Sequence, residues 1–401
     1  MIATNGYAIP MLTLVGAFYF VENILCFSDR SRGQSTISTM STTAEQISLP
    51  LDLTQLEALA QPALSPMAWD YIRGGAADEI TLHANRSAFD QIRLKPRVLC
   101  DVSKIETGVE LFGQKFASPI LLAPAAYHRL YHAEGELAAV RGANASGAGV
   151  VISSFATFAI EEITRESKTK PWFQLYVNPD RGFTQALVER AERAGCAALC
   201  LTVDTPVLGC RYRERDFKLP ADIECPNVAA IAKEAVAAHR PVRERIYSDV
   251  FDPALSWRDI AWLRSVTRLP IVLKGILNPD DAGRAVDAGA DGIIVSNHGG
   301  RNLDTLPATI EALPLVTDRV ADRIPVLVDG GIRRGTDVLK ALALGGRAVL
   351  IGRPYLYGLA LAGARGVAHV LDILRAELAM AMALAGRQSL AEIDHTVLWN
   401  G

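Results

Sequence analysis

Short runs of apolar residues recur along the chain from residue 119 onward. Each run is followed by a polar or glycine-rich turn and then by a stretch with helical spacing. Strands that read as near-continuous apolar runs are typical of parallel sheets, which are buried on both faces. The runs lie at 120–123, 150–152, 173–177, 198–203, 271–273, 292–295, 325–328 and 348–351, and helical patterns at 134–148, 159–167, 181–194, 257–266, 279–288, 306–319 and 335–344.

Eight strands that alternate with helices predict a (β/α)8 TIM barrel of the α/β class. A doubly wound open sheet is the alternative, but it usually carries a glycine-rich fingerprint after its first strand, and none follows 120–123. One connection is much longer than the others. It includes residues 221–256, which are charged and alanine-rich, and loops of this length tend to be lids or mobile segments.

The residues before the first strand predict a helical extension. Two short helices are expected at 52–60 and 66–73. The glycine pair at 74–75 ends the second helix, and Asp78 and Glu79 can begin a third. We therefore expect short helices to precede the barrel.

Residues 1–39 differ in character from the rest of the chain. The stretch 7–27 is largely apolar but is interrupted by a proline, a glycine and an acid, and no basic residue precedes it. We interpret 1–39 as a dispensable or upstream-extended start and 40–401 as a single barrel domain, because Met40 opens a stretch that reads like a natural beginning. A membrane anchor through 7–27 and a secretory signal are the alternatives.

Composition narrows the class of protein. The chain has 401 residues, of which 50% are hydrophobic and 21% charged, with a formal net charge of −3. This balance gives no electrostatic case for nucleic acid binding. The six cysteines form no CxxC pair, and no histidine stands at metal-ligand spacing. We therefore expect free thiols in a reducing, cytoplasmic setting and no metal site.

The stretch Ser296–Asp304 is the most informative single segment. It follows an apolar run directly and reads SNHGGRNLD, with a glycine pair between His298 and Arg301. An imidazole can exchange protons near neutrality, and an arginine can hold a carboxylate in a bidentate grip. A base beside an anion clamp suits a small carboxylic acid that must lose a proton. A glycine-capped turn without function is the alternative for this stretch taken alone.

Polar side chains close the other runs as well. In a TIM barrel the active site lies at the carboxyl ends of the strands. A lysine, a histidine, acids and several arginines on one rim therefore indicate function. The residues in question are Pro124, Ala125, Ala126, Ser153, Gln174, Tyr176, Thr202, Asp204, Arg211, Lys274, Ser296, His298, Arg301, Asp329, Gly331, Arg333, Gly352 and Arg353.

The residues that follow the last two strands predict a phosphate-binding site, and polar residues at the ends of other strands suit a flavin ring. DGGIRRG and IGRP supply glycines, backbone N–H groups, Arg333 and Arg353 at the usual phosphate location of a barrel. Ser153, Gln174 and Thr202 could form hydrogen bonds with the edge of a heterocycle. Lys274 could stabilise negative charge on a reduced flavin ring.

Over roughly residues 50–390 the chain resembles the FMN-dependent α-hydroxy acid oxidases and dehydrogenases. The motifs that carry the resemblance are YIRGGAADE, PRVLCDVS, APAAYHRLYHAEGE, WFQLYV, LTVDTP, LKGI, SNHGGRNLD, LVDGGIRRGTDVLKALALGG and IGRPYLYGLA. The resemblance implies FMN as cofactor, a homotetramer or higher homo-oligomer, and oxidation of an (S)-2-hydroxy acid to the 2-oxo acid.

The resemblance also implies roles for individual residues. His298 matches the base, Asp204 the acid that orients it, and Lys274 the lysine beside the flavin N1–C2=O edge. Arg211, Arg301 and Tyr71 match the groups that hold the substrate carboxylate, and Tyr176 matches the tyrosine near the substrate hydroxyl. The expected FMN shell is Pro124, Ala125, Ala126, Ser153, Gln174, Thr202, Lys274, Ser296, Asp329, Gly331, Arg333, Gly352 and Arg353.

Four positions depart from the family pattern and leave the substrate side chain undecided. Ala125 stands where some members have threonine, Phe155 where glycolate oxidases have tryptophan, and Cys210 where many have arginine. Tyr127 follows APAA as in the hydroxymandelate oxidase branch. Phe155 and Tyr127 are accordingly expected to line the substrate pocket, and lactate, glycolate and mandelate are all candidates.

The electron acceptor is expected to be oxygen, giving hydrogen peroxide, because no haem domain is appended and the long loop carries no membrane insertion. A quinone-linked dehydrogenase is the alternative and would gain from an anchor at 7–27. Two hypotheses from other classes are a Schiff-base lyase or isomerase that uses Lys274, and a non-catalytic barrel that serves as a binding module.

Overall fold

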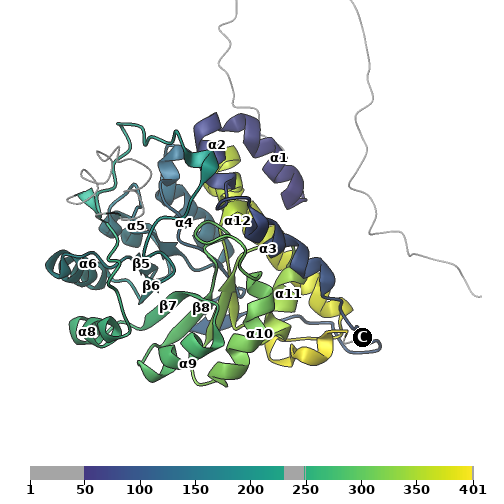
Figure 1. Cartoon of the computed structure of the whole chain (residues 1–401). Helices are drawn as coiled ribbons and strands as arrows, with labels where there is room; N and C mark the ends of the chain where they lie inside the picture. Colours follow the sequence, from purple (N-terminus) through teal and green to yellow (C-terminus); the bar gives the residue numbers. More distant parts are fainter. Residues whose placement is uncertain (1–48, 230–247, 249, 400–401) are drawn as a thin grey trace, which may run out of the picture. The chain divides into compact units, whose positions relative to one another are not determined.

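The structure is a computed structural model that describes residues 49–229, 248 and 250–399. In this part of the chain, eight parallel strands form one sheet in the order β3-β10-β9-β8-β7-β6-β5-β4, and a parallel bridge between Leu122 and Val150 joins the two end strands. The sheet is thus closed into a barrel, with helices around it (Figure 1). This confirms the TIM barrel and excludes the doubly wound sheet.

The strands follow the predicted apolar runs closely. Register is continuous between neighbours, except for a bulge in β7 between Lys274 and Ile276. The strands are β3 (Ile120–Leu122), β4 (Val151–Ile152), β5 (Trp172–Leu175), β6 (Ala198–Thr202), β7 (Ile271–Ile276), β8 (Gly292–Val295), β9 (Val326–Asp329) and β10 (Ala348–Ile351).

The helices between the strands also match the predicted ranges to within a few residues. They are α4 (Gly135–Ser146), α5 (Ile160–Glu166), α6 (Arg181–Ala194), α8 (Arg258–Val266), α9 (Pro279–Asp287), α10 (Thr309–Val320) and α11 (Gly335–Ala343). Short 3-10 segments are η1 (His128–Leu130), η2 (Tyr212–Glu214), η4 (Leu390–Glu392) and η5 (His395–Val397).

The expected helical extension is present as α1 (Leu53–Ala63), α2 (Pro66–Arg73) and α3 (Ile80–Gln91). Asp52 caps α1, since its side chain accepts from the backbone N–H of Thr54. Ser65 caps α2 in the same way through the N–H of Ala68. These caps fix where the two helices begin.

Three details of the predicted pattern were wrong. Tyr176 does not lie on the third strand, because β5 ends at Leu175. Lys274 does not end the fifth strand, since β7 continues through the bulge to Ile276. The last helix, α12 (Arg353–Leu384), was not predicted; it runs on from β10 and is kinked at residues 362–363, where the backbone leaves helical geometry.

The core has two parts, which follow from the alternation of side chains along each strand. Outward residues such as Leu199 and Leu201 pack against the helices, whereas inward residues such as Cys200 and Leu350 fill the barrel. The hairpin β1 (Val109–Leu111) and β2 (Gln114–Phe116) packs onto this inner cluster. The barrel interior is thus filled by apolar side chains and by the hairpin.

Several expectations fall on residues that are not described. Residues 1–39 lie outside the described part of the chain, and so do 230–247 and 249 of the long loop. Within the described residues, the helices include none that is both long and apolar enough to cross a membrane. The five cysteines in the described ranges are all free thiols.

Candidate active site

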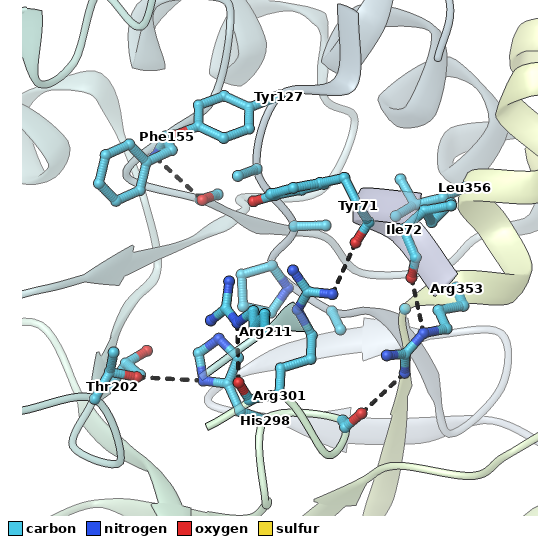
Figure 2. A pocket seen from close by; sticks show the side chains of 18 of the residues that line it. Tyr71, Ile72, Tyr127, Phe155, Thr202, Arg211, His298, Arg301, Arg353 and Leu356 are labelled. Atoms are coloured by element: carbon cyan, nitrogen blue, oxygen red, sulfur yellow. Dashed lines mark hydrogen bonds between the residues drawn. The ribbon is translucent and has the colours of Figure 1, made fainter. Parts of the chain in front are cut away.

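A cavity of about 1010 Å³ lies among the residues that follow the strands. Figure 2 shows its polar floor, with His298, Arg211, Arg301 and Arg353 gathered from distant parts of the chain. Nearly every residue singled out in the sequence lines it, which confirms that the predicted rim converges on one space. The exceptions are Asp204 and Ser296. They do not line the cavity, but each is hydrogen-bonded to a residue that does, Asp204 to His298 and Ser296 to Lys274.

His298 forms a pair with Asp204. The Nδ1 atom of His298 lies 2.9 Å from Oδ1 of Asp204. A carboxylate only accepts hydrogen bonds, so Nδ1 carries the proton and Nε2 keeps its lone pair. The backbone of His298 is in the left-handed region (φ 58°), and its N–H donates to Oγ of Ser296 at 3.1 Å. Asp204 therefore fixes the tautomer of His298, and the turn after β8 fixes the position of its ring.

Asp204 is held from several sides. Thr205 Oγ1 donates to Oδ1 at 3.0 Å, and Asn302 Nδ2 donates to the Asp204 backbone oxygen at 2.8 Å. Gly275 (φ 111°) packs against it, and a Cβ at that position would lie 2.5 Å from the Asp204 Cβ. The bulge in β7 therefore makes the room that Asp204 occupies.

The electrostatics keep Asp204 charged and His298 neutral. Burial acts to raise the pKa of Asp204, but the nearby His298 and Lys274 outweigh it, and the pKa falls below its ordinary value. Burial lowers the pKa of His298, and the attraction of Asp204 opposes this only in part. Near neutrality His298 is thus a neutral imidazole that can accept a proton.

Arg301 is fixed by backbone and acidic acceptors. Its NH1 donates to the backbone oxygens of Tyr71 at 2.7 Å and Gly74 at 2.8 Å, and its NH2 donates to Oε1 of Glu214 at 2.6 Å. Its guanidinium carbon lies 5.0 Å from the centroid of the Tyr71 ring, a cation–π contact. The extension before the barrel thus helps to build the site.

Arg211 lies beside Arg301 and shares its acid. Its Nε donates to the Arg301 backbone oxygen at 2.9 Å, and its NH1 donates to Oε2 of Glu214 at 3.2 Å. The predicted pair of arginines therefore exists, but both are bridged by Glu214, which sequence reasoning missed. The alternation of charges in RYRERD and the spacing of three between Arg211 and Glu214 were the available signals.

Lys274 is a buried ammonium group. Its Nζ lies 3.1 Å from Oδ2 of Asp329 and donates to Oγ of Ser296 at 2.9 Å. Burial acts to lower the pKa of Lys274, but Asp329 and Asp204 raise it above its ordinary range. The lysine is therefore a fixed positive charge at the floor of the cavity. This state disfavours the Schiff-base hypothesis, which needs a neutral amine.

Arg353 is one of the two arginines that the sequence places at the expected phosphate location, and it lines the cavity. Its guanidinium donates to the backbone oxygen of Ile72 at 2.8 Å (Figure 2). It also donates to the backbone oxygens of Gly74 at 2.9 Å and Gly299 at 3.0 Å. Burial, together with the charge of nearby Arg301, lowers the pKa of Arg353 to about 10. Arg353 thus ties the end of α2 to the turn that bears His298.

The residues present fit a flavin mononucleotide. Arg333 and Arg353 line the cavity beside Gly352, the residue before the first turn of α12, so positive charge and a helix N-terminus meet where a phosphate would lie. Oδ1 of Asp329 is buried without a hydrogen-bond partner among the described residues, as suits an acceptor for a ribityl hydroxyl. The positive charge of Lys274 would stabilise the edge of the flavin ring that gains negative charge on reduction.

Aromatic rings form the opposite wall of the cavity. Tyr71 stacks on Phe217 with ring centroids 4.6 Å apart, and Tyr127 lies 5.6 Å from Tyr71 and 5.9 Å from Phe155. Phe155 in turn lies 6.0 Å from Tyr176. Burial raises the pKa of Tyr71 and Tyr176, so both are neutral phenols. Sequence reasoning found the wall in part but missed Phe217 and Phe251.

Comparison with known proteins places this site in context. Residues 60–400 match the profile of the family described as FMN-dependent dehydrogenase. The chain is 49% identical over 361 residues to the L-lactate oxidase of Nostoc sp., covering 88% of this chain and 99% of that protein. It is 47% identical over 352 residues to a peroxisomal (S)-2-hydroxy-acid oxidase of Oryza sativa subsp. japonica, covering 87% and 95%.

The fold is similar to that of solved mandelate oxidase structures. One of them, with (S)-4-hydroxymandelic acid, has a TM-score of 0.81 and 43% sequence identity, covering 87% of this chain and 98% of that one. Another, with (S)-2-phenylpropionate, has a TM-score of 0.79 and 41% identity, covering 88% and 98%. The likeness therefore extends over nearly the whole barrel.

Proposed function

The chain belongs to the FMN-dependent dehydrogenase family and is an FMN-dependent oxidase of 2-hydroxy acids, and from this premise we propose how its residues act and which acids it takes. The substrate is a 2-hydroxy monocarboxylic acid with an apolar side chain. The observation that carries this proposal is the arrangement of the cavity: an arginine pair and a histidine–aspartate pair face a wall of aromatic rings.

Arg211, Arg301 and Tyr71 bind the substrate carboxylate. Each guanidinium has five N–H groups, and Glu214 and backbone oxygens use only part of them. The remaining N–H groups can grip a carboxylate, and the Tyr71 hydroxyl can add a third donor. Holding the acid at this end directs its hydroxyl-bearing carbon toward the cavity floor, and such positioning can supply several kcal/mol of the barrier.

His298 accepts the proton that the substrate loses. Its Nε2 is the nitrogen left available by the bond to Asp204, and Asp204 stabilises the imidazolium that results. Tyr176 lines the same cavity as a neutral phenol and can hold the substrate hydroxyl. These residues move and hold the proton whether the carbon–hydrogen bond breaks as hydride or as proton.

Residues at the other end of the cavity would hold the cofactor. FMN, when bound, supplies the two-electron acceptor for the reaction. Arg333, Gly352 and the turn that Arg353 fixes would hold its phosphate, Asp329 its ribityl chain, and Lys274 the ring edge. The remaining expected shell is Pro124, Ala125, Ala126, Ser153, Gln174, Thr202, Ser296 and Gly331.

The substrate side chain is expected to be apolar because of what surrounds it. Tyr127, Phe155, Tyr176, Phe217 and Phe251 contact one another around the cavity, and burial of an apolar group against rings is favourable. A charged group on that side chain would lose its hydration against the faces of these rings. Side chains from methyl to phenyl meet this requirement.

Oxygen is the proposed acceptor, with hydrogen peroxide as product, as the names of the oxidase relatives support. A quinone-linked dehydrogenase is the alternative, and it would reduce a quinone where an oxidase reduces oxygen. The homotetramer and the cytoplasmic location implied by the sequence stay predictions; sedimentation of the holoenzyme tests the first.

An anaerobic spectrum tests the proposed function. The purified holoenzyme is mixed without oxygen with lactate, 2-hydroxybutyrate, mandelate, glycolate or malate. We expect the flavin absorption to bleach with the (S) forms of the apolar acids, weakly with glycolate and hardly with malate. Admission of oxygen should restore the colour and release hydrogen peroxide. Absence of bleaching with every 2-hydroxy acid would defeat the proposal.

A further inference from the structure

Glu214 stands in an unusual place for an acid, inside the pair of arginines that would receive the substrate carboxylate. Its Oε1 lies 2.6 Å from NH2 of Arg301 and its Oε2 lies 3.2 Å from NH1 of Arg211. The Glu214 side chain is 11% exposed and each arginine side chain is 14% exposed, so solvent screens the cluster only weakly. One carboxylate thus already occupies part of each guanidinium.

The charges of this cluster have a simple consequence. Two guanidinium groups and one carboxylate leave a single positive charge, because arginine does not lose its proton in proteins. The other charged groups nearby offset one another: Asp329 pairs with Lys274, and the negative Asp204 beside the neutral His298 is balanced by Arg353, which lies close enough to Arg301 to feel its charge. A monocarboxylate would neutralise the cluster, whereas a dicarboxylate would leave an unpaired negative charge in a buried space.

We propose that Glu214 is a specificity-determining residue that restricts the arginine pair to monocarboxylates. Rejection of a competitor by a built-in repulsive charge is a general route to specificity. The inference rests on the proposed function, since it assumes that Arg211 and Arg301 receive the substrate carboxylate. The new element is that Glu214, which lies between the two arginines, determines the charge of the ligand that they bind.

Other charged residues near the cavity are less well placed than Glu214 to set the charge of the carboxylate site. Arg215, Asp216 and Lys218 also line the cavity, but they are exposed, so water screens them. Glu79 pairs with Arg213, with Oε1 2.7 Å from Nε, and does not line the cavity. Among the described residues, Glu214 is the acid that both lines the cavity and contacts the two arginines.

Ligand binding to the oxidised holoenzyme tests the proposal without turnover. Malonate and 3-methylbutanoate have nearly the same shape, but malonate carries a second carboxylate where the other has two methyl groups. Each is titrated above neutral pH, and the change in the flavin absorption spectrum gives its dissociation constant. The measured quantity is the ratio of the malonate constant to the 3-methylbutanoate constant, in which general losses of affinity cancel.

We expect the wild-type ratio to be well above one and to fall by about tenfold or more in Glu214→Gln, because one like charge is removed a few ångströms from the second carboxylate. Glu214→Asp keeps the charge and should keep the wild-type ratio. Asp216→Asn removes an acid two residues away and is the matched control, expected to leave the ratio unchanged. Glu214→Ala should act as Glu214→Gln does, so that a folding defect in one variant does not decide the matter.

Two results would overturn the inference: an unchanged ratio in both Glu214→Gln and Glu214→Ala, or an equal fall in Asp216→Asn. If the wild-type holoenzyme binds neither acid, the arginine pair is not a carboxylate site and the proposed function fails with it. If it binds 3-methylbutanoate and only the effect of Glu214 is missing, the proposed function stands and the role of Glu214 is withdrawn.

Discussion

Nδ1 of His298 lies 2.9 Å from Oδ1 of Asp204, although 94 positions separate the two residues in the chain. The contact joins the turn after β8 to the end of β6 across β7, which lies between them in the sheet. It directs the unprotonated nitrogen of the imidazole toward the cavity. The expected chemistry depends on this one bond, and several measurable consequences follow from its surroundings.

Replacement of Asp204 should separate geometry from charge. In Asp204→Asn the amide can still occupy the space, but it can offer its N–H groups to Nδ1 and so favour the wrong tautomer of His298. We expect the turnover number to fall by roughly 10²–10⁴-fold, while flavin remains bound. Steady-state kinetics and the flavin content of the purified variant measure both. Wild-type turnover in Asp204→Asn would remove the aspartate from the mechanism.

The pH dependence follows from the state of His298. Burial lowers its pKa, and the base must be neutral to accept a proton. Activity should therefore be absent in acid and rise with pH through a point below the ordinary histidine value. Because Asp204 acts to raise that pKa, Asp204→Asn should move the acid limb of the profile of kcat/KM to still lower pH. An acid limb above the ordinary value would contradict the described environment.

Gly275 provides a test of how the fold makes room for the pair. Its φ of 111° suits glycine, and an added Cβ would lie 2.5 Å from the Cβ of Asp204. Gly275→Ala should cost about 1–3 kcal/mol of unfolding free energy and also lower the turnover number. Gly289→Ala is the matched control, since its φ is 82° but nothing lies within 4 Å of the added Cβ. Denaturant unfolding compares the two, and equal losses of activity in both would refute the specific contact.

Arg353 should matter for cofactor binding through its shape as well as its charge. Its guanidinium donates to Ile72, Gly74 and Gly299 at once, which a lysine cannot reproduce. We expect Arg353→Lys to weaken FMN binding by tenfold or more, measured by quenching of flavin fluorescence on titration of the apoprotein. Arg323→Lys, in a more exposed pair with Asp287, should leave it unchanged. Unaltered FMN affinity in Arg353→Lys would count against this role.

The strands and the rim were predictable from the sequence because both leave local signals. Apolar runs mark buried parallel strands, and the residue after each run faces one end of the barrel. His298 and Lys274 could be assigned to one site on that ground alone. The bulge in β7 and the long α12 were not predictable in the same way, because Gly275 and the residues after Arg353 take their conformation from contacts distant in sequence.

Glu214 shows what local signals could not supply. In the sequence it is one charge among several in RYRERD, and such a run is usually a solvated face. Only the fold shows that Glu214 reaches Arg301, which lies 87 positions further along the chain. Arg353 is a second example, since its bonds to the backbone oxygens of Ile72, Gly74 and Gly299 join parts of the chain that are far apart in the sequence.

The most direct test of the central claim is the rate at which substrate reduces the flavin in His298→Ala. The variant is mixed rapidly, without oxygen, with lactate or another acid that bleaches the wild-type protein, and the flavin absorption is recorded. The variant should be purified yellow, with FMN bound, because His298 acts as the base and does not lie among the residues expected to hold the FMN phosphate. We expect the rate of bleaching to fall by about 10²–10⁴-fold while the spectral change on binding 3-methylbutanoate is kept. Bleaching at the wild-type rate would contradict the assignment of His298 as the base.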